Sequence, residues 1–184
     1  MSAPSRLLAR LRAALRSFPR QRRGSAAIEF AMVAPIFLAL IFAIMETSLV
    51  FFAGQVLETG TQDTARLLLT QQAQSKGWGQ ADFKKDLCDR VSLLFECNGI
   101  YVDVQSYPPN TPIVISNPID GSGNFTNNFV YQPPPQNSAN TVVVRTFYQW
   151  PLYVTRLGYN IANIGADSSS PKKLLAATTA FRVQ

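Results

Sequence analysis

The sequence contains no histidine among its 184 residues. Histidine is the usual general base, the partner of nucleophilic serine or cysteine, and a common zinc ligand. No glycine-rich phosphate loop is present either. The aspartates of residues 82–89 are interleaved with basic residues, which is typical of a solvated helix face with i,i+4 ion pairs. We therefore predict a protein that is not an enzyme, with no catalytic residue, no metal site and no cofactor.

Acidic residues are absent from residues 1–24, which hold seven of the seventeen basic residues, all of them arginine. Without this leader the formal net charge changes from +6 to −1. The rest of the chain thus lacks the excess of basic residues that accompanies nucleic-acid binding. We predict no nucleic-acid partner.

A long apolar run follows the leader and extends to Ala53, interrupted by Glu29, Pro35 and the polar residues 46–48. As a helix, residues 30–53 would be ~36 Å long, enough to cross a hydrocarbon core of ~30 Å with some tilt. Leu, Ile, Val and Phe side chains in this segment contribute about 4 to 8 kcal/mol to insertion, against roughly 2.5 to 3.5 kcal/mol for Glu46. We predict a transmembrane helix over residues 25–53.

The arginines of the leader lie next to this single predicted span. By the positive-inside rule they place the N-terminus in the cytoplasm and send the remaining residues, 54–184, across the membrane. A mitochondrial transit peptide shares the composition of the leader, and Arg22-Arg23 resembles a twin-arginine export signal. The apolar run is too long for a secretory signal peptide.

Gly24 and Glu29 mark the junction between the leader and the span. Glu29 puts a carboxylate where the bilayer begins, so a neutralising partner is expected. If the chain is cut after Gly24, the new α-amine of Ser25 lies about one helical turn from that carboxylate. The amine of the same subunit or of a neighbouring subunit could neutralise it.

Two residues inside the span are unusual. Pro35 removes a backbone donor and should kink or loosen the helix, which suits a subunit that leaves the membrane but is also tolerated in ordinary transmembrane helices. Glu46 is a functional candidate because it is ionisable and lies in a membrane segment. It either pairs with a partner or extends its carboxylate to the outer interface.

These residues together carry a resemblance to a known family. Residues 24–30 resemble the prepilin-peptidase site of type IV pilin-like proteins. The longer run, with Ala34-Pro35 inside the span, Glu46 at its far end and Ala65-Arg66 beyond, is similar to the TadE-like family of tight-adherence (Flp) pilus proteins. The resemblance is specific over residues 24–66 and diffuse beyond them.

The resemblance implies that Gly24 precedes a cleavage site, Ser25 is the mature N-terminus and Glu29 is the assembly glutamate. It implies a minor pilin or pseudopilin that acts in assembly of a surface-attachment pilus, located in the bacterial inner membrane and, after processing, in the extracellular pilus. Its partners would be a prepilin peptidase, the major pilin, other minor pilins and the inner-membrane assembly platform, together with the lipid bilayer. The alternative is an uncleaved, single-span envelope protein that binds a ligand.

We predict that the exported part forms one α+β domain. Helical spacing continues from the span to Gln71, and Gly77 and Gly79 are expected to stop the helix. The result is one long helix with a transmembrane half and an amphipathic half. A second helix is expected to begin after Asp82 as its N-cap and to end at Asn98-Gly99. Period-two alternation predicts three strands near residues 100–104, 141–150 and 174–183, forming an antiparallel sheet packed on the long helix.

Residues 108–140 differ in composition from the rest of the domain, with seven of the twelve prolines. Residues 113–115 and 129–131 are candidates for short edge strands within this loop. A long irregular segment is either a partner-specific surface or a solvated excursion. Residues 151–165 are compatible with a short helix or with an irregular connection.

Cys88 and Cys97 are the only cysteines and both fall in the exported part. A structural disulfide is the first interpretation, and two free thiols the alternative. In an unbroken helix their Cα atoms would be ~13.5 Å apart, whereas a disulfide needs less than ~7 Å. A disulfide therefore requires the chain to turn near Phe95.

Overall fold

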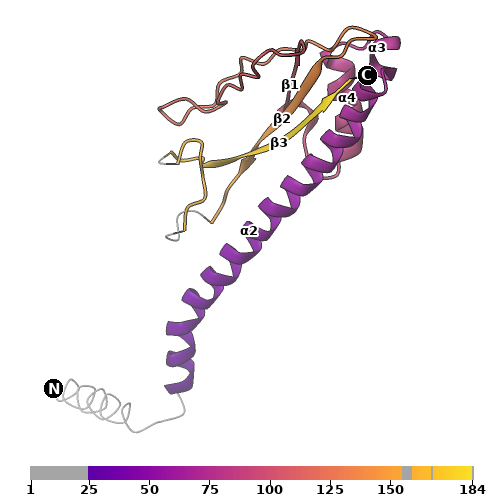
Figure 1. Cartoon of the computed structure of the whole chain (residues 1–184). Helices are drawn as coiled ribbons and strands as arrows, with labels where there is room; N and C mark the ends of the chain where they lie inside the picture. The colour runs from indigo at the N-terminus through magenta and orange to yellow at the C-terminus, as the bar shows by residue number, and fades with distance from the viewer. Residues whose placement is uncertain (1–24, 155–158, 167, 184) are drawn as a thin grey trace, which may run out of the picture. The chain divides into compact units, whose positions relative to one another are not determined.

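The computed structural model describes residues 25–154, 159–166 and 168–183. Its elements are, in chain order, α2, α3, α4, a short 3₁₀ helix and the strands β1, β2 and β3 (Figure 1). The chain divides into two units, residues 1–42 and residues 43–184. The expected α+β class is confirmed by a long N-terminal helix, a shorter helix and a three-stranded antiparallel sheet.

Helix α2 runs from Ser25 to Leu69 and passes through Pro35. Within the first unit its large apolar side chains are exposed, among them Phe30, Ile36 and Phe37. In the described part of the chain, α2 is the one helix long and apolar enough to cross a membrane. Its length and composition fit a single membrane span, and they also fit a signal sequence near the N-terminus.

The later part of α2 has a buried face in the second unit. Ala53, Leu57, Thr61, Thr64 and Leu68 follow one another at spacings of three and four and are almost inaccessible to solvent. The helix ends at Leu69, earlier than the expected stop at Gly77 and Gly79, and Gln71 takes a left-handed conformation with φ of 59°. A short helix α3, Gln72–Ser75, follows.

Helix α4 spans Gln80–Val91. The prediction that Asp82 is its N-cap is wrong, because Asp82 is the third residue of the helix and Gly79 is the cap. The Asp82 carboxylate instead accepts the Gly79 N–H at 2.9 Å, so the acidic side chain stabilises the helix start from inside the first turn. The helix also ends earlier than expected, at Val91 rather than at Asn98-Gly99.

The sheet consists of β1 (Ile100–Tyr107), β2 (Thr141–Pro151) and β3 (Lys172–Arg182), all antiparallel, with β2 in the centre. Figure 1 shows the three strands side by side within the second unit. Val102 is opposite Thr146 and Asp103 is opposite Arg145, which assigns these neighbouring pairs to opposite faces. The described residues between β2 and β3 form an irregular connection.

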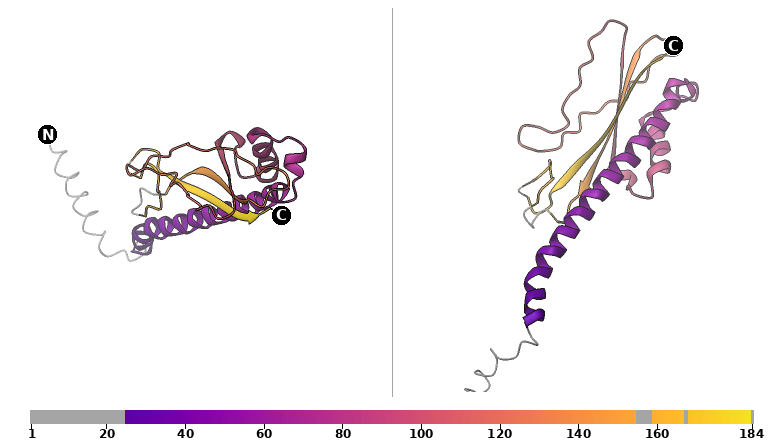
Figure 2. Two further views of the ribbon diagram at one scale, coloured as in Figure 1. Left: turned by 45° about the horizontal axis from the view of Figure 1, so that its top comes forward. Right: turned by 60° about the horizontal axis from the view of Figure 1, so that its bottom comes forward.

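The inner face of the sheet packs against the later part of α2, as expected, and also against α4 (Figure 2). Val102, Val104, Val142 and Val144 are buried there with residues of both helices. A hydrogen bond between the buried hydroxyls of Thr61 and Thr146 links α2 to β2. Two polar side chains thus satisfy each other inside an otherwise apolar layer.

Gly60 allows α2 and α4 to approach closely. A Cβ atom at this position would stand 2.6 Å from Cγ1 of Val91 and 3.2 Å from Cδ1 of Leu87. Gly54, six residues earlier in the same helix, has no atom within 4 Å of the corresponding point. Glycine is therefore required by packing at residue 60 and not at residue 54.

The outer face of the sheet is covered by loop 108–140. A second apolar cluster forms around Phe147 and Leu174, with Tyr101, Phe125 and Phe129 packed against it. The predicted edge strands at 113–115 and 129–131 are absent, apart from an isolated parallel bridge between Val104 and Tyr131. The loop is fixed by side-chain packing and single hydrogen bonds rather than by strand pairing.

Candidate functional site

The first turns of α2 carry the residues expected to govern processing and assembly. Gly24 lies outside the described residues, and Ser25 is the first residue of the helix. Glu29 stands one turn later at a solvent-exposed position. Pro35 follows within α2, and the helix continues for more than thirty residues beyond it. The peptide bond expected to be cut thus lies immediately before the first described residue.

Glu46 is buried, with 7% of its surface exposed. Its carboxylate accepts the backbone N–H of Tyr153, and Val154 donates to the same group at 3.1 Å from Oε2. These two donors lie just beyond β2, where the chain has left the ladder and its N–H groups need other acceptors. The Glu46 carboxylate therefore has hydrogen-bond partners within its own chain.

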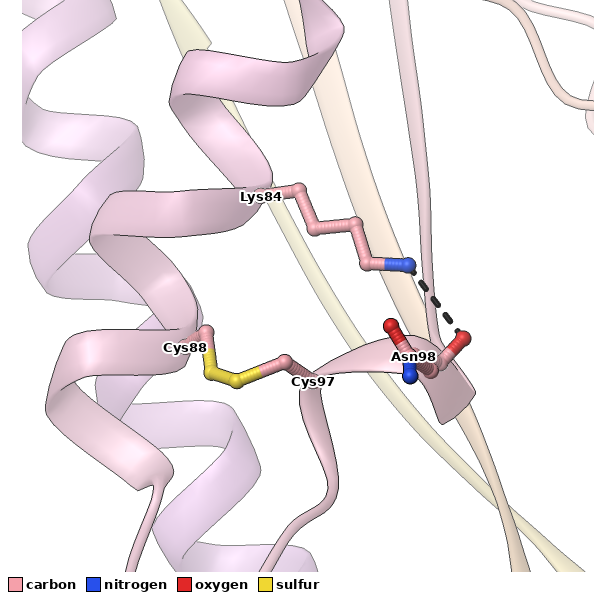
Figure 3. Close-up of a disulfide and its surroundings, with 4 residues drawn as sticks. All are labelled: Lys84, Cys88, Cys97 and Asn98. Atoms are coloured by element: carbon pink, nitrogen blue, oxygen red, sulfur yellow. Dashed lines mark hydrogen bonds between the residues drawn. A yellow bond between two sulfur atoms is a disulfide. The ribbon is translucent and has the colours of Figure 1, made fainter.

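A disulfide joins Cys88 to Cys97, with their Cα atoms 5.4 Å apart (Figure 3). Cys88 lies on α4, and Cys97 begins the 3₁₀ helix Cys97–Gly99 that leads into β1. The required turn is present, because α4 ends at Val91 and the chain reverses before Phe95. Lys84 donates to the carbonyl of Asn98 at 3.3 Å and reinforces the same junction.

The outer face of the sheet holds a buried ion pair that the sequence pattern did not indicate. Arg145 donates to Asp103 through Nη2 at 2.6 Å, and 5% and 1% of the two side chains are exposed. Arg145 also donates to the carbonyl of Ser116, and the Asp103 carboxylate accepts the N–H of Val130. Two strands and two parts of loop 108–140 therefore meet at one pair of charges.

The only available signal for this pair was the placement of two charged residues within otherwise apolar strands. Asp103 interrupts the run from Val102 to Val104, and Arg145 follows three consecutive valines. A charge at such a position is rarely buried unless it is paired. Their register in the sheet, 42 residues apart in the chain, supplies the pairing.

Other polar groups of the second unit have pKa values that differ from their usual ones. Hydrogen bonds from Asn124 and Ser122 hold the pKa of Asp120 below its usual value, within loop 108–140. Burial raises the pKa of Tyr131 to about 12. The expected i,i+4 pair on α4 is present between Asp86 and Arg90, and raises the pKa of Arg90.

None of these groups assembles into a reaction centre. In the part of the chain that the structure describes, no three of the side chains suited to metal binding lie close together. The groups with shifted pKa values are held in place by burial and hydrogen bonds. The arrangement is suited to holding a fold and presenting surfaces.

Residues 24–66 match the sequence model of the family described as TadE-like protein. The matched segment covers the start of α2 and continues to within three residues of its end. The family resemblance predicted from the sequence is confirmed over these residues. No curated protein and no solved structure matches the chain.

Proposed function

We propose, from the match of residues 24–66 to the TadE-like protein family, that this chain is a minor pilin or pseudopilin of a tight-adherence (Flp) pilus. TadE-like proteins are a pilin-like family without enzymatic activity. The family match is the observation that carries the proposal. The apolar surface of α2 and the small α+β unit that follows it support the same conclusion.

The chain inserts once into the bacterial inner membrane, with its N-terminus in the cytoplasm. The arginines of residues 1–24 favour this orientation through the positive-inside rule. The exposed apolar side chains of α2 in the first unit suit contact with lipid. The second unit then lies in the periplasm, where an oxidising environment agrees with the disulfide of Cys88 and Cys97.

A prepilin peptidase hydrolyses the peptide bond between Gly24 and Ser25. One observation supports this position: the family match begins at Gly24. The basic leader is removed and Ser25 becomes the mature N-terminus.

Glu29 then acts in assembly. Its carboxylate is one helical turn from the new α-amine of Ser25, and it lies on an exposed part of α2. An amine from a neighbouring subunit at this position would neutralise the carboxylate in a low-dielectric environment and would fix the axial register of packed helices. The partners of this step are the major pilin, other minor pilins and the assembly platform of the inner membrane.

The proposal is tested by Glu29→Gln in the native host, with Glu58→Gln as the matched control. Glu58 lies on the same helix and is part of the second unit. We expect Glu29→Gln to abolish or strongly reduce pili seen by electron microscopy, while the mature protein still accumulates in the membrane. Normal pili in the Glu29→Gln strain would contradict the assembly role, and loss of pili with Glu58→Gln would show that the effect is not specific.

The second candidate function is a permanently anchored binding protein. It is favoured by one observation, the exposed apolar residues Ile113, Val114 and Ile115 in loop 108–140, of which Val114 is 72% exposed. In this case the leader is retained and pili form without the protein. Deletion of the gene separates the two functions, because the pilin-like function requires loss of pili.

A further inference from the structure

Helix α2 has two different faces at the start of the second unit. Glu46, Val50, Ala53 and Leu57 are spaced by three and four residues and are buried beneath the sheet. On an adjoining side of the helix, about a quarter turn away, Met45, Leu49 and Phe52 have the same spacing and are 55–58% exposed. The folded unit therefore covers one side of the helix and leaves an apolar stripe exposed next to it.

Exposed large apolar residues recur along the sequence of α2 as far as Phe52 and then stop. Large apolar side chains are exposed at short intervals along α2 from Ile28 to Phe52. Beyond Phe52 the exposed positions of the helix are polar, as at Gln55, Thr59 and Gln62, and the next exposed large apolar residue is Leu69. The surface of α2 thus changes from one suited to lipid to one suited to water ten residues after the second unit begins.

Two exposed tyrosines lie at the level of this transition. Tyr153 donates its backbone N–H to Glu46, and its side chain is 82% exposed. The hydroxyl of Tyr159 is hydrogen-bonded to Thr47 at 3.2 Å, and its side chain is 41% exposed. Tyrosine is enriched at membrane interfaces because its ring is apolar and its hydroxyl is polar.

The position along the helix agrees with a membrane boundary. Twenty residues from Ser25 end at Ile44, and a helix of that length spans ~30 Å, the thickness of the hydrocarbon core. Glu46 then stands at the outer border of the core, and Phe52 ~11 Å beyond Met45, within reach of the headgroups. The Glu46 carboxylate has two backbone N–H donors there, which reduces the free energy of placing its charge next to lipid.

We propose that the folded unit rests directly on the outer surface of the bilayer through a membrane-facing surface formed by Leu49, Phe52, Tyr153 and Tyr159. This inference depends on the membrane span given under the proposed function and adds a second contact to it. The lipid headgroups are the occupant because exposed apolar side chains of α2 stop at Phe52, and the two exposed tyrosines are hydrogen-bonded to Glu46 and Thr47, within two helical turns of that point. Before assembly, the unit is thereby held close to the membrane instead of projecting freely from the end of the span.

The test places an environment-sensitive fluorophore, NBD, at single introduced cysteines of the full-length protein in liposomes of phosphatidylethanolamine and phosphatidylglycerol. The native cysteines are joined in a disulfide, so the introduced thiol is labelled selectively. The variants are Tyr153→Cys for the proposed surface, Ile36→Cys for the span, and Gln62→Cys with Leu69→Cys as controls further along α2. Quenchers are a nitroxide on the headgroup, a nitroxide at mid-chain and iodide in the water.

We expect the label at residue 153 to lose most fluorescence to the headgroup nitroxide, and the label at residue 36 to the mid-chain nitroxide. The labels at residues 62 and 69 should be quenched by iodide alone. Quenching of residue 153 by iodide alone, with residue 36 still quenched by lipid, would overturn the inference and leave the span intact. Protection of residue 153 from all three quenchers would also overturn it, because a second copy of the chain would then cover the surface. Failure of lipid to quench residue 36 would instead contradict the membrane span itself.

Discussion

Arg145 donates two hydrogen bonds to one carboxylate oxygen of Asp103, from Nε at 2.9 Å and from Nη2 at 2.6 Å. The pair joins β1 to the centre strand β2 and lies beneath loop 108–140. Both side chains are buried, so each charge depends on the other for compensation. The loop is held in place by the same two residues, through the carbonyl of Ser116 and the N–H of Val130.

Removal of one partner of this pair should strongly destabilise the second unit. We expect Arg145→Met to lower the free energy of unfolding by about 3 to 5 kcal/mol, because it leaves Asp103 charged and buried without a counter-ion. Chemical denaturation of the protein in detergent micelles measures the change. The matched control is Arg182→Met on the exposed side of β3, which should change the free energy by less than about 0.5 kcal/mol. Equal effects of the two substitutions would contradict the buried pair.

The disulfide of Cys88 and Cys97 closes a short loop between α4 and β1. Replacement of both cysteines by serine should lower the free energy of unfolding by roughly 2 to 3 kcal/mol, since the unfolded chain regains the entropy of the open loop. The pair also holds the chain reversal at the end of α4. Denaturation of the variant, compared with the oxidised and the reduced wild-type protein, measures this effect. A reduced wild type as stable as the oxidised one would show that the bond has no stabilising role.

Gly60 and Gly54 form a matched pair of glycines in one helix. Gly60→Ala should destabilise the protein by about 1 to 3 kcal/mol, because its methyl group would collide with Val91, whose β-branched side chain has little rotameric freedom. Gly54→Ala meets no neighbouring atom and should stabilise the helix by about 0.5 to 1 kcal/mol. Thermal unfolding of the two variants measures the difference. Stabilisation by both substitutions would rule out the close approach of α2 and α4.

Tyr131 makes stability depend on pH in the alkaline range. Burial raises the pKa of its hydroxyl from 10.0 to about 12, so the folded state favours the neutral form. This contribution is fully present below pH 10 and is lost as the pH rises toward about 12. The wild type should therefore lose stability relative to Tyr131→Phe over this interval.

At neutral pH, Tyr131→Phe should be neutral or stabilising by up to about 1 kcal/mol, because it removes a hydroxyl that has no hydrogen-bond partner among the described residues. Denaturation at a series of pH values from 7 to 11.5 measures both effects. Tyr153→Phe, which changes an exposed hydroxyl, is the control. A constant difference between Tyr131→Phe and the wild type across the series would contradict the burial of this hydroxyl.

The parts of the fold that were predictable from the sequence are those set by local patterns. Helical spacing identified α2, and alternation identified β1, β2 and β3, because each element buries one face at its own period. The turn between Cys88 and Cys97 followed from the reach of a disulfide. Asp82 was misplaced because an acidic residue is favourable both as an N-cap and in the first turn, and the sequence does not distinguish these positions.

Contacts between residues that are far apart in the chain could not be predicted from local sequence patterns. The donors to Glu46 are 107 and 108 residues away, and Asp103 is 42 residues from Arg145. Loop 108–140 was expected to contain edge strands, but its apolar residues pack onto the outer face through aromatic side chains such as Phe125 and Phe129. Side-chain packing of this kind has no period from which it could be read.

The most direct test of the proposed function is the intact mass of the protein extracted from its native membrane, in the wild type and in a strain that lacks the prepilin peptidase. We predict a wild-type mass that corresponds to residues Ser25 through Gln184, and the full-length mass of Met1 through Gln184 without the peptidase. The full-length mass in both strains would contradict processing at Gly24 and Ser25. The chain would then be a permanently anchored envelope protein.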